Sequence, residues 1–217
     1  LGIIVLLKNK NMIKKTIVII AILVLTALVS DELSIKPDEN SGVEWIDIND
    51  IDKKVTRVKV LIFNSENKIL LCNVEGKYTF IGGHVEENET LTMALIRELR
   101  EETGIVLDKQ DFNSFIKIEK WNKNHFNSGK NCLSEIYYYS FYTDYTIDKE
   151  KMNLDDLEKN KNFFLKYMDV AEFYDYLYYQ INFLNSELHS EMLFVLKYYV
   201  ENICRGKLNE KKLQKTL

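Results

Sequence analysis

Three glutamates near the middle of the chain have the type and spacing needed for chemistry: Glu98, Glu101 and Glu102. An α-helix has about 3.6 residues per turn, so positions i, i+3 and i+4 share one face and bring these carboxylates together. Like charges at such spacings destabilise a helix by roughly 0.2 to 0.5 kcal/mol per pair. A divalent cation removes this repulsion, since clustered carboxylates suit Mg²⁺ or Mn²⁺ and Mg²⁺ joins a few of them to phosphate oxygens. The spacing therefore predicts a helix face that binds metal and a diphosphate.

The neighbouring residues predict how this helix begins, packs and ends. Thr90 suits the N-cap position, and Gly104 is the left-handed residue expected just past the C-terminus. Apolar residues recur on the side opposite the glutamates: Leu91, Ala94, Leu95 and Leu99. Such a stripe is typical of a helix that packs on a sheet.

Two further features are expected to orient the acidic face. Arg97 stands four residues before Glu101 and can also reach back to Glu89 at the helix entrance. The preceding loop contains Gly82 and Gly83, which lack a Cβ, so their backbone can approach a ligand closely. We therefore expect the Gly82 carbonyl to join the carboxylates around a metal ion.

The whole pattern from Gly83 to Ile105 resembles the Nudix box of the Nudix hydrolase superfamily. It reads Gly, five residues, Glu89, seven residues, then Arg-Glu-aliphatic-any-Glu-Glu-any-Gly-aliphatic, and each fixed position is present. Members of the family usually carry a proline before the two glycines, where this chain has Ile81.

This resemblance implies an α/β (α+β) fold of the Nudix type. In it, a mixed β-sheet lies between the box helix on one face and a C-terminal helix on the other, an α/β/α sandwich. The implied reaction is hydrolysis of the diphosphate linkage of a nucleoside diphosphate joined to another moiety, X. The alternative is a Nudix-fold sensor or regulator that binds a nucleotide without hydrolysing it.

The resemblance also implies roles for individual residues. The expected ligands of Mg²⁺ or Mn²⁺ are Glu98, Glu101, Glu102 and Gly82. The expected catalytic residues are Glu98 and Glu101, with Glu98 acting either as a metal ligand or as the group that orients or deprotonates the attacking water. Structural support is expected from Gly83, Glu89, Arg97 and Gly104. Many members draw one more carboxylate from a late loop, which makes Asp156 and Glu158 candidates.

Composition narrows the class of partner. The 217-residue chain has a formal net charge of −4, which argues against a protein that grips a nucleic-acid backbone. Its 46% hydrophobic residues are enough for a packed core. Cys72, Cys132 and Cys204 are scattered and odd in number, so they indicate neither a disulfide framework nor a zinc site. A small nucleotide substrate fits best, and the sequence leaves the oligomeric state open.

The N-terminal region has a different character from the rest. Lysines precede an uncharged apolar run from Thr16 to Val29, an arrangement that resembles a signal peptide or membrane anchor. This predicts a membrane-anchored or exported protein if the segment is native, and a cytoplasmic one otherwise. We expect this segment at 1–30, an acidic linker at 31–54, the Nudix domain at 55–204 and a basic tail at 205–217.

Hydrophobic alternation and turn residues predict the remaining elements. The expected strands are Thr56–Phe63, Lys68–Val74, Tyr78–Ile81, Phe112–Trp121, Ser134–Thr143 and Phe163–Met168. Helices are expected from Asp169 to Leu177 and from Leu188 to Ile203.

Overall fold

The computed structural model describes residues 46–107, 112–123, 128–154, 159, 161–184 and 186–204. The apolar run Thr16–Val29, most of the expected linker, the basic tail and the candidate carboxylates Asp156 and Glu158 lie outside these residues. Within the described ranges, no helix has both the length and the apolar character needed to cross a membrane.

Residue contacts divide the chain into two compact units. In the smaller one, the described residues 46–54 come together with residues 117–123 and 128–134. It contains the short 3₁₀ helix η2, Ile48–Asp50. Its backbone pairs at Asn131, whose carbonyl accepts the N–H groups of Asp52 at 3.0 Å and Lys53 at 3.1 Å.

The larger unit holds most of the sheet and the α-helices of the described residues. The strands are β1 (Lys53–Phe63), β2 (Lys68–Val74), β3 (Lys77–Thr79), β4 (Asn113–Asn122), β5 (Cys132–Tyr142) and β6 (Phe164–Asp169). The helical elements are α2 (Leu91–Thr103), α4 (Val170–Leu184), α5 (Glu187–Tyr198) and the π-helix η4 (Tyr199–Cys204).

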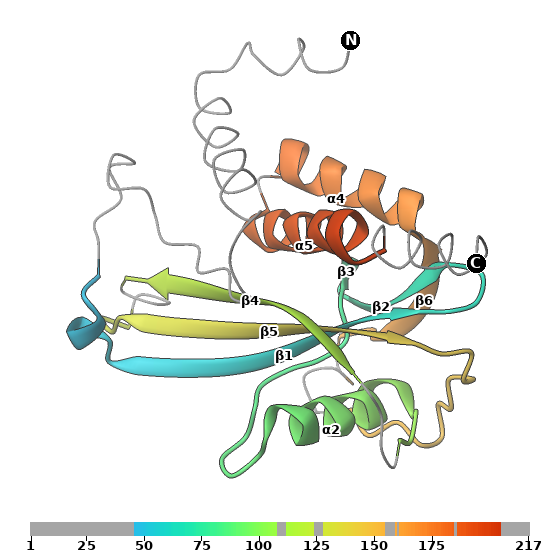
Figure 1. Ribbon diagram of the computed structural model, residues 1–217, viewed down its shortest axis with the longest axis horizontal. Coiled ribbons are helices and arrows are strands. Elements are labelled where there is room, and N and C mark those ends of the chain that lie inside the picture. The colour runs from blue at the N-terminus through green and yellow to red at the C-terminus, as the bar shows by residue number, and fades with distance from the viewer. Residues whose placement is uncertain are drawn as a thin grey trace, which may run out of the picture. The chain divides into compact units, whose positions relative to one another are not determined.

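The strand order is β3-β2-β1-β5-β4, and β6 pairs antiparallel with β2. In Figure 1, α2 lies on one face of the sheet and α4 and α5 lie on the other. The predicted α/β/α sandwich with a mixed sheet is therefore confirmed.

The apolar stripe of α2 packs as its spacing predicts. Ala94, Leu95 and Leu99 are fully buried and Leu91 is half-buried. They share one core cluster with Val58, Val60 and Ile62 of β1 and Leu70 and Cys72 of β2. At roughly 25 cal/mol per Å² of buried apolar surface, this packing fixes the helix far more strongly than its intrinsic propensity does.

The second face of the sheet is covered by aromatic side chains. Phe80 meets Tyr138 and Phe173 edge to face, at ring-centroid distances of 6.2 and 5.7 Å. Phe63 stacks on Tyr199 at 5.1 Å. Aromatic pairs at such distances add roughly 0.5 to 1.5 kcal/mol beyond their buried area.

Several expected boundaries differ from those observed. β2 is as predicted, whereas β1 starts at Lys53 and β3 ends at Thr79. Beyond β3 the chain crosses to β1, where Ile81 forms an isolated bridge with Val60. Helix α4 continues to Leu184, and the last predicted helix is an α-helix that turns into a π-helix at Tyr199.

His189 joins α5 to α4 and to the sheet through a chain of hydrogen bonds. Its side chain is fully buried, with Nδ1 2.6 Å from Ser186 Oγ and Nε2 3.3 Å from the Tyr176 hydroxyl. That hydroxyl accepts the Tyr78 N–H at 3.1 Å. Burial, followed by the charge of Lys77, lowers the pKa of His189 below the ordinary value of 6.5.

This lowered pKa makes stability depend on pH. As the pH falls below 6.5, the unfolded chain takes up a proton at His189 before the folded chain does. The free energy of unfolding should therefore fall as the pH drops from 6.5 to the folded-state pKa, and then level off for this group. In urea unfolding from pH 7.5 to 5, His189→Gln should reduce this slope. The exposed His84→Gln is the control, and an equal slope in wild type and His189→Gln would contradict the assignment.

Candidate active site

The acidic helix α2 begins and ends as its sequence predicts. Thr90 accepts the Met93 N–H through its side chain at the N-cap. Gly104 is the C-cap, in the left-handed conformation with φ 71°, and its N–H donates to the Arg100 carbonyl. These caps and the buried stripe fix which way the three glutamates face.

Arg97 organises the acidic face. Its Nε and Nη2 donate to the two carboxylate oxygens of Glu89, at 2.8 and 2.9 Å. Its Nη1 donates to Glu98 at 2.9 Å and to Glu101 at 3.0 Å. The hydrogen bond from Arg97 holds the pKa of the Glu89 carboxyl below its usual range. The pairing expected from the sequence is present, and it links the loop to both glutamates.

Two glycines let the loop approach the glutamates. A Cβ on Gly83 would lie 2.3 Å from Glu98 Oε1, inside any allowed contact. The Gly82 N–H donates to Glu102 Oε1 at 3.1 Å. Gly82 itself has φ 123°, and a Cβ there would lie 2.3 Å from the Val58 carbonyl oxygen. A side chain at Gly82 would therefore clash with the β1 backbone, and one at Gly83 would have to displace the Glu98 carboxylate.

Glu98 and Glu102 are largely removed from water. Glu102 is 4% exposed, and the Glu98 side chain is 12% exposed. Burial raises the pKa of the Glu98 carboxyl, and the hydrogen bond from Arg97 only partly opposes this rise. A buried carboxylate whose charged form is disfavoured gains most from a cation beside it.

The predicted metal ligands are divided between two partners. Arg97 holds Glu98 and Glu101, whereas Glu102 binds the Gly82 N–H. Across the part of the chain that the structure describes, no three His, Cys, Asp or Glu side chains gather as a metal site. The oxygen-only donors, the burial of Glu98 and the close approach of the Gly83 backbone to its carboxylate suit a hard divalent cation. The ligand set of Glu98, Glu101, Glu102 and Gly82 stays a prediction.

The sequence analysis missed Lys59, on β1. Its Nζ donates to the Gly82 carbonyl at 2.5 Å and to the Phe80 carbonyl at 3.1 Å. The signal was a lysine between two valines, Val58 and Val60, in an otherwise apolar run. Both valines are fully buried. His84, directly after the glycine loop, is exposed and accepts the Arg57 Nε–H at 3.2 Å.

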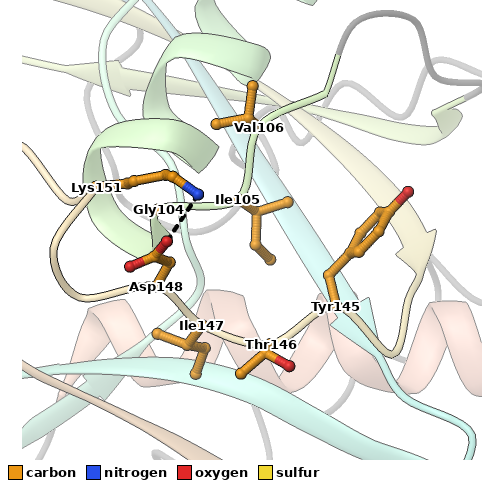
Figure 2. A pocket seen from close by; sticks show the side chains of 8 residues that line it. All are labelled: Gly104, Ile105, Val106, Tyr145, Thr146, Ile147, Asp148 and Lys151. Carbon is orange, nitrogen blue, oxygen red and sulfur yellow. Dashed lines mark ion pairs between the residues drawn. The ribbon is translucent and has the colours of Figure 1, made fainter.

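A pocket lies where α2 ends, with a cavity volume of about 460 Å³. Figure 2 shows the Asp148–Lys151 ion pair on one side, the Tyr145 ring on the other and Ile105 between them. The ion pair measures 2.8 Å, and the Asp148 N–H donates to the Thr103 carbonyl at 3.3 Å. The following loop donates the Asn153 N–H to the Glu101 carbonyl at 2.9 Å. This pocket is thus attached to the helix that carries the glutamates.

The family model described as NUDIX domain matches residues 53–185. The chain belongs to the Nudix family. The match covers β1, the glycine loop, the acidic helix and every strand after it, and it ends one residue beyond α4. As a Nudix-type hydrolase domain, the protein has its box helix and glycine loop where the residue pattern predicts them.

Solved structures with a similar fold share little sequence with this Nudix domain. MutT from Aliivibrio salmonicida and Vibrio cholerae is 21% identical, with 56% of this chain and 85% of that chain covered and a TM-score of 0.38. The Ap4A hydrolase of C. elegans is 15% identical, with 67% of this chain and 96% of that chain covered and a TM-score of 0.41. The NUDIX domain of Shewanella oneidensis NrtR, complexed with ADP ribose, is 16% identical, with 73% of this chain and 94% of that chain covered and a TM-score of 0.47. No curated protein matches the chain.

Replacing Gly83 with alanine should separate site geometry from stability. The new Cβ meets only the end of the Glu98 side chain, which can move, so the free energy of unfolding should change by less than about 1 kcal/mol. The displaced carboxylate should weaken Mn²⁺ binding and lower turnover by about a hundredfold. Calorimetric Mn²⁺ titration and urea unfolding measure the two effects. Unchanged Mn²⁺ affinity in Gly83→Ala would show that Glu98 is not a metal ligand.

Gly104→Ala tests the end of the acidic helix. Alanine at a left-handed position costs about 1 to 2 kcal/mol, and here its Cβ would also lie 2.0 Å from the Asp148 carbonyl oxygen. Gly76 has a similar φ of 82° with nothing within 4 Å of a new Cβ, which makes Gly76→Ala a matched control. In thermal and urea unfolding, Gly104→Ala should lose about 1 to 3 kcal/mol more than the control. Equal losses would show that the loop at Asp148 does not brace the helix.

Proposed function

We propose that this Nudix domain is a divalent-metal-dependent hydrolase that cleaves the diphosphate linkage of a nucleoside diphosphate joined to another moiety, X. The observation that carries the proposal is the fit between the acidic face of α2 and the bare glycine loop. At Gly83 a Cβ would lie 2.3 Å from a Glu98 carboxylate oxygen, so the backbone lies directly beside the acidic group. Packing alone does not require a buried glutamate at this place.

Each residue of the site has a distinct task in this proposal. Glu98, Glu101 and Glu102, with the Gly82 carbonyl, would hold Mg²⁺ or Mn²⁺. The bound ion would supply charge neutralisation of the diphosphate and a more acidic water. Glu98, as a ligand or as the group that takes the proton of the attacking water, is suited to the second role because burial raises the pKa of its carboxyl.

Arg97 and Glu89 act as positioning residues. Their two-point ion pair fixes the guanidinium, and the same guanidinium limits where Glu98 and Glu101 can point. An arginine fork bound at two points keeps its orientation better than a single contact would. The carboxylates therefore need little reorganisation to meet a substrate.

The proposal predicts metal-dependent release of a phosphorylated product. The purified full chain should hydrolyse one class in a panel of nucleoside diphosphate derivatives with Mg²⁺ or Mn²⁺, and chelator should abolish the reaction. Glu101→Gln should lower turnover by more than about a hundredfold. Loss of a residue that only hydrogen-bonds to a metal ligand lowers activity by up to about a hundredfold, and loss of a ligand itself should cost more. Folding should change little, because the Glu101 side chain is 31% exposed.

Glu66→Gln is the matched control for this substitution. Glu66 is exposed in the turn between β1 and β2 and pairs only locally with Lys68 at 2.7 Å. It should keep full turnover. If Glu101→Gln were as active as Glu66→Gln, the assigned roles would be wrong. Nucleotide binding without turnover across the panel would instead favour a sensor.

A further inference from the structure

Lys59 carries a charge in a strand whose flanking residues are apolar and buried. It lies in β1 between two fully buried valines and is itself half-buried. Its ammonium donates to the Gly82 carbonyl at 2.5 Å and to the Phe80 carbonyl at 3.1 Å. Burying part of a lysine costs desolvation free energy, and these two contacts offset that cost.

The Gly82 carbonyl cannot turn away from this ammonium. The Gly82 peptide N–H is held by Glu102 Oε1 at 3.1 Å, and the residue has φ 123°. The carbonyls of the flanking residues Ile81 and Gly83 accept the N–H groups of Val60 and Val58, each at 3.0 Å. The backbone on both sides is therefore paired with β1. A cation that binds the Gly82 oxygen must share it with Lys59 or displace it.

The Gly82 carbonyl that binds Lys59 also lies next to the acidic helix. Gly83, the following residue, meets the Glu98 carboxylate, since a Cβ there would lie 2.3 Å from Glu98 Oε1. Lys59 therefore binds the carbonyl that the proposed metal site needs, one residue before a glycine that meets one of its carboxylates. A lysine is a point charge on a flexible four-carbon stem, so its ammonium can move to another acceptor while its backbone stays in the strand.

We propose that Lys59 is a built-in cation that competes with the divalent metal for the Gly82 carbonyl and, once displaced, binds the phosphate of the substrate. This inference rests on the proposed metal-dependent function. No covalent bond forms or breaks and no proton is transferred, because the ammonium exchanges one hydrogen-bond acceptor for another. Lys59 would thereby couple metal binding to phosphate binding.

The proposal predicts opposite effects on metal and on substrate. A divalent ion and an ammonium roughly 5 Å apart repel enough, even in bulk water, to change a binding constant about tenfold. In Lys59→Met the charge is lost while a similar apolar stem remains. The dissociation constant for Mn²⁺ without substrate should therefore fall about tenfold, whereas KM for the diphosphate substrate should rise.

The experiment is calorimetric Mn²⁺ titration of the full chain, followed by KM and kcat at saturating Mn²⁺. Lys59→Arg keeps the charge and should leave Mn²⁺ affinity close to that of the wild type. Lys53→Met removes an exposed lysine from the same strand and should change neither quantity. In the unmodified protein, Mg²⁺ should shift the ¹⁵Nζ signal of Lys59 and leave that of Lys53 in place. This last measurement keeps the proposal testable if Lys59→Met does not fold.

Distinct outcomes separate this inference from the proposed function. If the wild type binds Mn²⁺ and turns over but Lys59→Met binds Mn²⁺ no more tightly, the competition is refuted and the hydrolase stands. A simultaneous loss of Mn²⁺ affinity and of stability in Lys59→Met would show a purely structural lysine. If no variant binds Mn²⁺, the inference and the proposed metal dependence both fail.

Discussion

The acidic face of α2 packs against a loop that has no side chains where the two meet, and the rest of the site depends on this contact. Glu98 occupies the space that a Cβ on Gly83 would need, and Glu102 binds the N–H of Gly82. Carboxylates brought this close repel one another and lose hydration. Arg97 offsets both effects, since it donates to Glu89, Glu98 and Glu101 at the same time.

The fold supplies the rigidity that this arrangement needs. On one side of α2 a fully buried stripe joins the helix to β1 and β2, so the helix cannot roll to separate its charges. At its C-terminus Gly104 ends the helix in a left-handed conformation, with the Asp148 carbonyl directly beside it. On the far face of the sheet an aromatic layer beneath α4 and α5 covers the strands.

The sequence predicted those features that follow from local spacing. The turn residues Asn64 to Asn67 before β2 and Glu75 and Gly76 after it delimit that strand, and its bounds are as expected. The cap at Thr90, the stop at Gly104 and the Arg97–Glu89 ion pair follow from helix periodicity, and each is observed. Such features need only neighbouring residues, so their physics is visible without a fold.

Features that depend on tertiary contacts were not predictable in the same way. Lys59 alternates correctly for a strand, and nothing local shows that its ammonium meets the Gly82 carbonyl 23 residues away. Ile81 was expected to end β3, but it pairs with Val60 of β1 because the chain crosses strands there. Helix α4 extends past Leu177 with exposed aromatic residues on its last turns, which no apolar stripe indicated. In each case a distant partner decides the outcome.

The central claim is that the glutamates of α2 and the glycine loop together bind divalent metal at one site, where a diphosphate is hydrolysed. A crystal structure of the full chain with Mn²⁺ and a non-hydrolysable nucleoside diphosphate analogue, with anomalous data at the manganese edge, tests it most directly. The account predicts anomalous peaks within bonding distance of Glu98, Glu101, Glu102 and the Gly82 carbonyl, with the analogue's diphosphate on the metal. Manganese bound elsewhere, or an analogue bound away from α2, would contradict it.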